Sequence, residues 1–213
     1  MARLVCISDT HNQHPHIKVP GGDVLIHAGD ITSRGSAAEM AKFGEWLRVL
    51  PHKYKIVICG NHDFIGEDDP DGTRRLLADA IYLQDSSVDI CGLKIFGSAW
   101  TPYFGGWAFN LPRGPMLADK WAEIPEDVEV VVTHGPPMLI GDQVHGEGTL
   151  AIENVGCSDL AARLRQLPKL KAHVYGHIHD GHGLRTINGI HYVNAAVLND
   201  RYQIAYSPIV LDL

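Results

Sequence analysis

Short apolar runs that end in polar clusters recur along the chain. Three of them, at 3–9, 23–28 and 54–59, lie in the first third, and two more follow at 128–133 and 172–175. Their near-continuous apolar character is typical of strands that are buried on both faces of a parallel sheet. Together with the helical pattern between the second and third runs, the order strand, strand, helix, strand indicates an α/β protein.

The segment 36–50 has a helical pattern. Its apolar residues recur at intervals of three or four, which places them on one face of a helix. Ser36 is the expected N-cap and Pro51 the stop. A shorter helix is predicted over 71–79, with Asp71 as its cap. Another ends before Pro168 and has an apolar face formed by Leu160, Leu164 and Leu167.

The rest of the chain is predicted to form shorter elements. Residues 98–114 are rich in glycine, proline and aromatic residues and are expected to be a long loop, as are residues 134–152. No repeat, low-complexity tract or linker interrupts the pattern, so residues 1–213 are interpreted as one domain. Short strands are predicted at 81–83, 88–91, 93–97, 184–187, 190–193 and 209–211.

Side chains that bind metals follow each of the five main strands. Because the ends of parallel strands meet along one edge of a sheet, we expect these clusters to converge there. Within two of them the ligands are two residues apart, so in an extended chain they point the same way. The clusters are Asp9-Thr10-His11, Gly29-Asp30, Gly60-Asn61-His62-Asp63, Thr133-His134-Gly135 and Gly176-His177-Ile178-His179.

The candidate ligands are oxygen and imidazole groups without a thiolate. This set suits Mn²⁺, Fe, Zn²⁺, Co²⁺ or Ni²⁺ rather than a cysteine-type structural zinc. A lone buried histidine is more often part of the core, but five clusters in succession favour a metal site. Seven ligands are too many for one ion and suit two ions that share a carboxylate. They are Asp9, His11, Asp30, Asn61, His134, His177 and His179.

This series of motifs resembles that of the calcineurin-like metallophosphoesterase superfamily, and the likeness covers nearly the whole chain. Within the superfamily, the stretches 51–61, 81–86, 100–114 and 133–137 are similar to the small metallophosphoesterase-domain proteins first noted in vertebrate brain and to their bacterial relatives. Some animal members have glycine where this chain has His177. Gly-Asn-His-Asp stands here in place of the commoner Gly-Asn-His-Glu, which leaves the ligands intact.

The resemblance implies a fold and a role for each residue. The fold is a four-layer α/β/β/α sandwich of two mixed sheets. Two divalent ions are implied, with Mn²⁺ the expected metal in vitro, and Asp30 bridges them. His62 faces the phosphate and assists the leaving oxygen, while Asp63 either holds that imidazole or accepts backbone hydrogen bonds. The first ion is held by Asp9, His11 and His179, and the second by Asn61, His134 and His177.

The function implied is that of a binuclear-metal-dependent phosphodiesterase. It hydrolyses small phosphodiesters, with cyclic nucleotides as the leading candidates, by in-line attack of a metal-bridging hydroxide. The alternatives are a phosphomonoester or protein phosphatase, a nuclease of the same superfamily, or a nucleotide-binding regulator with little turnover. The formal net charge of −7 disfavours a nucleic-acid partner, which would require a basic face.

Two residues in the aromatic stretch are weaker candidates for substrate binding, beside Asn61 and His62. Trp100 either stacks on a nucleobase or anchors the loop in a hydrophobic cluster. Arg113 either contacts a phosphate oxygen or caps the loop.

The compartment and partners are less constrained by the sequence. The four cysteines form no CxxC pair, and this usage suits a reducing compartment, so a cytoplasmic protein is expected. No apolar run approaches the ~18 residues of a membrane span, and no signal peptide is visible. The oligomeric state stays open, with a homodimer among the options.

Overall fold

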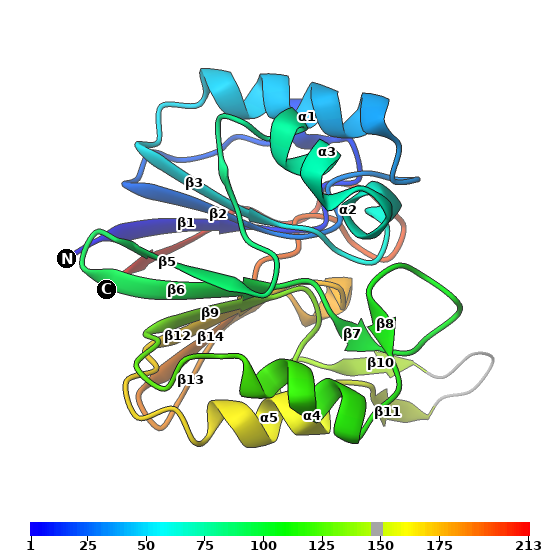
Figure 1. Cartoon of the computed structure of the whole chain (residues 1–213), viewed down its shortest axis with the longest axis vertical. Coiled ribbons are helices and arrows are strands. Elements are labelled where there is room, and N and C mark those ends of the chain that lie inside the picture. The colour runs from blue at the N-terminus through cyan, green and yellow to red at the C-terminus, as the bar shows by residue number, and fades with distance from the viewer. Residues whose placement is uncertain (146–150) are drawn as a thin grey trace.

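The computed structural model describes residues 1–145 and 151–213, which form four layers (Figure 1). Two mixed sheets face each other in the middle, and helices cover the outer face of each sheet. This arrangement confirms the expected α/β/β/α sandwich. The N-terminal and C-terminal strands pair with each other, so both ends of the chain lie at the same edge of the molecule.

The first sheet has five strands. Four are parallel neighbours and the C-terminal strand β15 is antiparallel at the edge. The sequence predictions placed all five strands to within a few residues. In spatial order they are β15 (Ile209–Asp212), β1 (Arg3–Ile7), β2 (Val24–Ala28), β3 (Tyr54–Ile58) and β4 (Ile81–Tyr82).

The second sheet has six strands. Its four central strands are parallel, and an antiparallel strand lies at each edge. In spatial order they are β13 (Gly183–Ile187), β14 (Ile190–Asn194), β12 (Ala172–Tyr175), β9 (Val130–Thr133), β6 (Leu93–Ser98) and β5 (Ser86–Ile90).

Alternate residues of each central strand enter different cores. Leu4 and Cys6 of β1 point into the core between the sheets, where they join Val174 of the second sheet. Val5 and Ile7 of the same strand point outward into the core beneath the helices. Both faces of the strand are therefore apolar because each face is covered by another layer.

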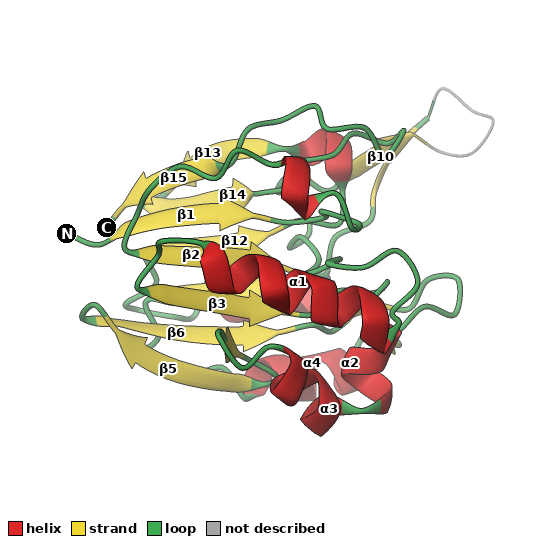
Figure 2. Ribbon diagram, turned by 90° about the horizontal axis from the view of Figure 1, so that it is seen from above, coloured by secondary structure: helices red, strands yellow, loops and turns green. Residues whose placement is uncertain are grey.

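The long helix α1 (Ala37–Val49) lies across β2 and β3 in Figure 2. Ser36 caps it as expected, since its hydroxyl accepts a hydrogen bond from the Glu39 amide, and the Glu39 carboxylate accepts one from Ser36 N. This capping box satisfies two backbone donors at once. The other helices are α2 (Phe64–Asp68) and α3 (Pro70–Leu76) beside α1, and α4 (Pro115–Ala122) and α5 (Ser158–Leu164) on the second sheet.

Several element predictions need correction. The helix expected over 71–79 is α3, and its cap is Asp69, which accepts a hydrogen bond from Gly72 N; Pro70 then takes the first helical position, where its missing amide has no cost. The helices α2 and α4 were not predicted, because neither fills the window of about eleven residues in which an apolar period is recognised. The equally short α3 and α5 were predicted from an adjacent cap residue and a terminating proline. Two one-turn 3-10 segments are η1 (His14–His16) and η2 (His179–Gly181).

Both expected loops contain strands. The aromatic stretch pairs β7 (Thr101–Pro102) with β8 (Asn110–Leu111). The loop expected over 134–152 contains β10 (Gln143–His145), which pairs with β11 (Ile152–Asn154). Its part at 146–150 lies outside the described residues.

All four cysteines are free thiols, and Cys6, Cys59 and Cys157 are buried. Among the residues the structure describes, no helix combines the length and hydrophobicity needed to cross a bilayer.

Two fully buried histidines make stability depend on pH. Burial lowers the pKa of His27 and of His173 from 6.5 to about 3, so both are neutral in the folded protein. The unfolded chain binds protons at these positions below pH 6.5, and stability is therefore lost as the pH falls from 6.5 towards 3. We expect each histidine to cost about 2 kcal/mol of unfolding free energy at pH 5.

Denaturant melts of chelator-treated protein at pH 7 and pH 5 test this expectation. In His173→Asn the loss of stability between the two pH values should be about 2 kcal/mol smaller than in the wild type. The exposed His16 provides the control, and His16→Asn should keep the wild-type loss. If His173→Asn lost as much unfolding free energy between pH 7 and pH 5 as the wild type, buried neutral His173 would not be a source of the pH dependence.

Candidate metal centre

The five predicted clusters converge at the carboxyl ends of strands from both sheets. Three follow β1, β2 and β3, and two follow β9 and β12 of the opposite sheet. Convergence was predicted correctly, but along the edge of one sheet, whereas the site lies between two. A parallel bridge between Ser8 and Ala196 and hydrogen bonds from His177 N to both oxygens of Asp9 join the two halves.

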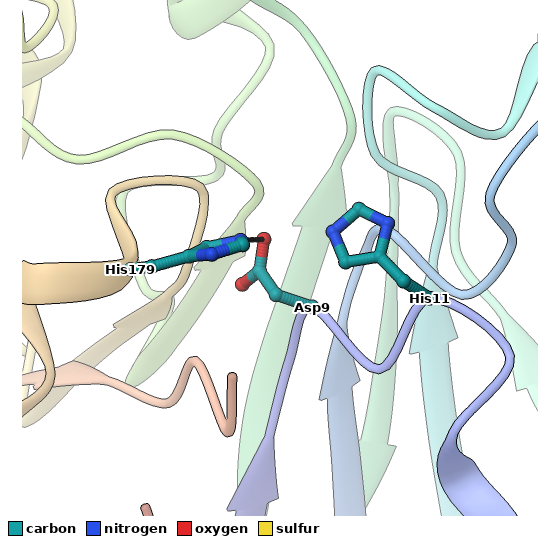
Figure 3. Close-up of side chains that lie close together, drawn as sticks. All are labelled: Asp9, His11 and His179. Atoms are coloured by element: carbon teal, nitrogen blue, oxygen red, sulfur yellow. Dashed lines mark ion pairs between the residues drawn. The ribbon is translucent and has the colours of Figure 1, made fainter. Parts of the chain in front are cut away.

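Asp9 lies at the centre of one group of ligands. In Figure 3 its carboxylate lies between the imidazoles of His11 and His179, and Asp9 Oδ1 is 3.5 Å from His179 Nε2. Ligand atoms of these three residues lie within 4.8 Å of one another. The three side chains are buried, so they can hold one small cation away from bulk water.

Asp30 lies between two further histidines. Its Oδ1 is 3.3 Å from His134 Nε2, and its Oδ2 is 3.6 Å from His11 Nε2. His134 Nε2 is also 2.9 Å from Asn61 Oδ1. The imidazoles of His134 and His177 lie edge to face with centroids 5.0 Å apart. The other five predicted ligands therefore gather around the carboxylates of Asp9 and Asp30, and Asp30 lies between His11 on one side and His134 on the other.

Backbone carbonyls orient four of the imidazoles. A carbonyl oxygen can only accept, so the Nδ1 atom facing it carries a proton, and Nε2 is the ring nitrogen that can bind a cation or carry a second proton. Such carbonyl contacts are the usual way in which proteins orient metal-binding histidines. The contacts are His11 to Thr32 at 3.2 Å, His62 to Ser33 at 3.1 Å, His134 to Ala28 at 2.9 Å and His179 to Asn199 at 2.9 Å.

The charges of the cluster favour bound cations. Burial alone would raise the pKa of Asp9, but the hydrogen bond from His179 and neighbouring imidazole charge lower it to about 2. Burial would likewise raise the pKa of Asp30, but His134 lowers it far below its usual range. In the reverse direction, burial opposes charge on His134, yet Asp30 raises its pKa to about 9. The oxygens therefore remain ionised and attract positive charge.

Backbone conformation at the ligands is strained. Asp9, His11, Asp30 and His177 all have positive φ, between 38° and 66°, which non-glycine residues rarely adopt. Each such residue costs of order 1–3 kcal/mol, and such strain concentrates at functional sites.

Two glycines permit the close approach of ligands to the backbone. A Cβ at Gly60 would collide with Asp30 and would lie 2.7 Å from His134 Cε1. A Cβ at Gly176 would collide with Asp9 and Ser8. Only glycine fits between the strand ends and the two central carboxylates.

His62 and Asp63 do not interact as catalytic partners. His62 Nδ1 donates to the Ser33 carbonyl, and its Nε2 lies 3.9 Å from Asp30 Oδ2. The carboxylate of Asp63 accepts hydrogen bonds from the amides of Gly60, Ile31 and Thr32 and from the Thr32 hydroxyl. Of the two roles considered for Asp63, the contacts match backbone support, so its assignment as a catalytic residue is corrected.

An open cleft of about 540 Å³ leads to the cluster. Aromatic rings form much of its wall: Trp107 stacks on His62 with centroids 4.2 Å apart, and Tyr202 lies edge to face with His11 at 4.9 Å. Its described lining residues are His11, Asp30, Asn61, His62, Phe104, Trp107, His177, His179, Asp200 and Tyr202.

Neither of the two weaker substrate candidates lines this metal cleft. Trp100 packs edge to face on Phe109 and donates its indole N–H to Asp85. Of the two roles considered for Trp100, these contacts match the anchoring of the loop. Arg113 donates to the carbonyls of Val155 and Gly156. The aromatic stretch does supply the wall of the cleft, but through Trp107 and Phe104, which sequence spacing could not distinguish from Trp100.

The donor set fits divalent metal ions. His11 Nε2 is buried and has no hydrogen-bond partner, although an orphaned polar atom of this kind is costly. His134 Nε2 faces the oxygens of Asn61 and Asp30, and a divalent cation among these three atoms would take the place of the proton that Nε2 otherwise carries. Two carboxylates, one amide oxygen and four imidazoles form a site for borderline divalent metals.

Comparison with known proteins agrees with the geometry. The profile of the Calcineurin-like phosphoesterase family matches residues 2–181, and the chain belongs to this family. It is therefore a metal-dependent phosphoesterase. The human metallophosphoesterase domain-containing protein 1 is 43% identical over 234 residues, with 99% of this chain and 71% of the human protein covered, and the mouse protein of the same name gives the same values.

A solved structure supports the fold alone. TT1561 of Thermus thermophilus is 12% identical, covers 91% of this chain and 88% of its own, and superposes with a TM-score of 0.61. The resemblance seen in the sequence motifs is thus confirmed at the level of the family and the fold.

Proposed function

We propose that this protein is a phosphodiesterase for small diesters, with cyclic nucleotides as the leading substrates. The observation that supports this proposal most directly is the cleft, in which aromatic rings border the ligand cluster. Base–aromatic stacking contributes about 1–3 kcal/mol per base in proteins that bind nucleic acids. A nucleotide base placed against the Phe104 ring of this wall would leave its phosphate beside Asp30.

Seven side chains would hold two divalent ions. Asp9, His11 and His179 surround one position, and Asn61, His134 and His177 surround the other. Asp30 faces both. When bound, the ions would supply positive charge to the phosphate oxygens and would lower the pKa of a nearby water. Mn²⁺ is our proposed metal for reconstitution in vitro.

His62 would supply the proton for the leaving oxygen. Its Nδ1 is committed to the Ser33 carbonyl, so Nε2 is the atom that holds and transfers the proton. The side chain is 13% exposed and lines the cleft, which gives a leaving group access to Nε2. A general acid in this position contributes about 10²–10⁴-fold.

The charge of the cleft favours a diester over a monoester. Among the described residues that line it there is no lysine or arginine, and Asp200 adds a carboxylate at the edge. A diester carries one negative charge, whereas a phosphomonoester dianion usually requires additional cationic groups. The net charge of −7 similarly disfavours a nuclease.

Turnover after metal reconstitution tests the proposal. The chelator-stripped protein, reloaded with Mn²⁺, is assayed on bis-p-nitrophenyl phosphate, p-nitrophenyl phosphate and 2′,3′- and 3′,5′-cyclic nucleotides. We expect kcat/KM for the diesters to exceed that for the monoester by at least about 10-fold, because the cleft adds no cation for a dianion. Preference for the monoester would favour a phosphatase, and nucleotide binding without turnover on any ester would favour a regulator.

We further propose a single-domain organisation and a cytoplasmic location. We treat residues 1–213 as one domain, since side chains of both sheets share the central core. Four free thiols, three of them buried, are consistent with the reducing cytoplasm as its compartment.

A further inference from the structure

A second, largely apolar pocket of about 310 Å³ adjoins the metal cleft. Its walls come from the aromatic stretch on one side and from the β10–β11 hairpin region on the other. The apolar side chains that form it include Pro102, Tyr103, Phe104, Pro136, Val144 and Val155. A pocket of this size can hold one planar ring.

The pocket shares two lining residues with the metal cleft. Phe104 and His177 line both cavities, and their rings lie edge to face with centroids 6.0 Å apart. Phe104 is 56% exposed and Tyr103 65% exposed, so two large apolar surfaces are open to a ligand here. Exposed apolar groups gathered beside a polar site are typical of binding surfaces.

The pocket and His62 lie on different sides of the ligand cluster. His62 contacts His11 and Trp107, whereas the pocket opens beside His177, which packs on His134. The leaving oxygen of a substrate must face His62 to receive a proton. The other ester arm leaves phosphorus in a different direction, and His177 and Phe104 lead from the cluster into the pocket.

We infer that this pocket binds the ester arm that remains on the phosphate product, and that this arm carries an uncharged planar ring, aryl or nucleobase. The inference rests on the proposed diesterase function and specifies the substrate class further. Arg113 is the one charged residue among the described lining residues. Two of its five N–H groups are engaged by Val155 and Gly156, and its planar guanidinium is suited to contact a ring.

Two diesters with the same leaving group separate this inference from the diesterase proposal. Bis-p-nitrophenyl phosphate retains an aryl arm after hydrolysis, and methyl p-nitrophenyl phosphate retains only a methyl group. In the Mn²⁺-loaded wild type we expect kcat/KM for the aryl diester to be higher by about 10-fold or more, because only the aryl arm buries its surface in the pocket.

Filling the pocket should remove this preference. Val144 is half-buried on β10 and is not among the proposed ligands, so Val144→Trp narrows the pocket without altering them. Activity on the aryl diester should fall about 10-fold, while activity on the methyl diester and the metal content stay unchanged. Val144→Ala is the matched control and should retain the preference. Val155 directly follows β11, and Val155→Trp fills the pocket from that side if Val144→Trp does not fold.

Each other outcome overturns a distinct statement. Equal kcat/KM for the two diesters in the wild type, unchanged in the filled variants, would overturn the inference and leave the diesterase proposal intact. The inference would also be overturned if kcat/KM fell by the same factor for both diesters in a filled variant that kept its full metal content. If the Mn²⁺-loaded wild type hydrolysed neither of the two diesters, the proposed function itself would be overturned.

Discussion

Asp30→Ala should abolish metal binding and turnover together. Asp30 faces His11 through one oxygen and His134 through the other, so its removal deprives both proposed ion positions of their shared charge. We expect the metal content of Mn²⁺-loaded protein to fall from two ions per chain to below one. Turnover of the preferred diester should fall at least about 10³-fold, since the charge stabilisation lost is worth several kcal/mol.

Metal analysis of dialysed protein and steady-state kinetics measure the two effects. Asp89 is an exposed aspartate on β5, and Asp89→Ala should keep both ions and full activity. Circular dichroism in chelator shows whether the Asp30 variant folds. An Asp30→Ala protein that bound two ions with wild-type affinity would contradict the assignment of Asp30 as the shared ligand.

His62→Ala should lose turnover but keep its metal. His62 Nε2 is in the cleft, the Nδ1 atom donates to the Ser33 carbonyl, and the backbone amide that donates to Asp30 is retained in the alanine variant. We expect about a 10²–10⁴-fold fall in kcat for a cyclic nucleotide, whose sugar oxygen is a poor leaving group. A nitrophenolate needs no proton to leave, so the fall on bis-p-nitrophenyl phosphate should be much smaller.

The contrast between leaving groups distinguishes acid catalysis from simple binding. A residue that only bound phosphate would affect both substrates equally and would raise KM. His16→Ala serves as a control, because His16 is exposed. Wild-type kcat on the cyclic nucleotide in His62→Ala, with two ions bound, would show that His62 is not the acid.

Much of the architecture was predictable because it is encoded locally. A strand covered on both faces must be apolar at every position, as Val5, Cys6 and Ile7 are, and an N-cap must offer a side-chain acceptor, as Ser36 does. The helices α2 and α4 escaped prediction because they are shorter than the window of about eleven residues that shows an apolar period, and neither was marked by a recognised cap or stop. The cap of α3 was misplaced by two residues, since Asp69 and Asp71 flank the same proline.

The candidate ligands were predictable for a related reason. Each cluster of ligands follows a predicted strand within a few residues, so the ligands and the strand that positions them are contiguous in the chain. The partners of those ligands are not contiguous: His134 is oriented by the carbonyl of Ala28, 106 residues away. A backbone carbonyl has no side-chain signature, so no pattern of residue types could have identified it.

The sequence by itself determined the class of the protein, the seven side chains gathered at the site and the layered α/β architecture. Only the tertiary structure decided that the site lies between two sheets, that Asp63 supports the backbone, and that Trp107, Phe104 and Tyr202 line the cleft in place of Trp100. Residue type and spacing determine which groups are present at a strand end. Which of several similar rings faces them depends on how distant segments pack, and that is settled by the fold as a whole.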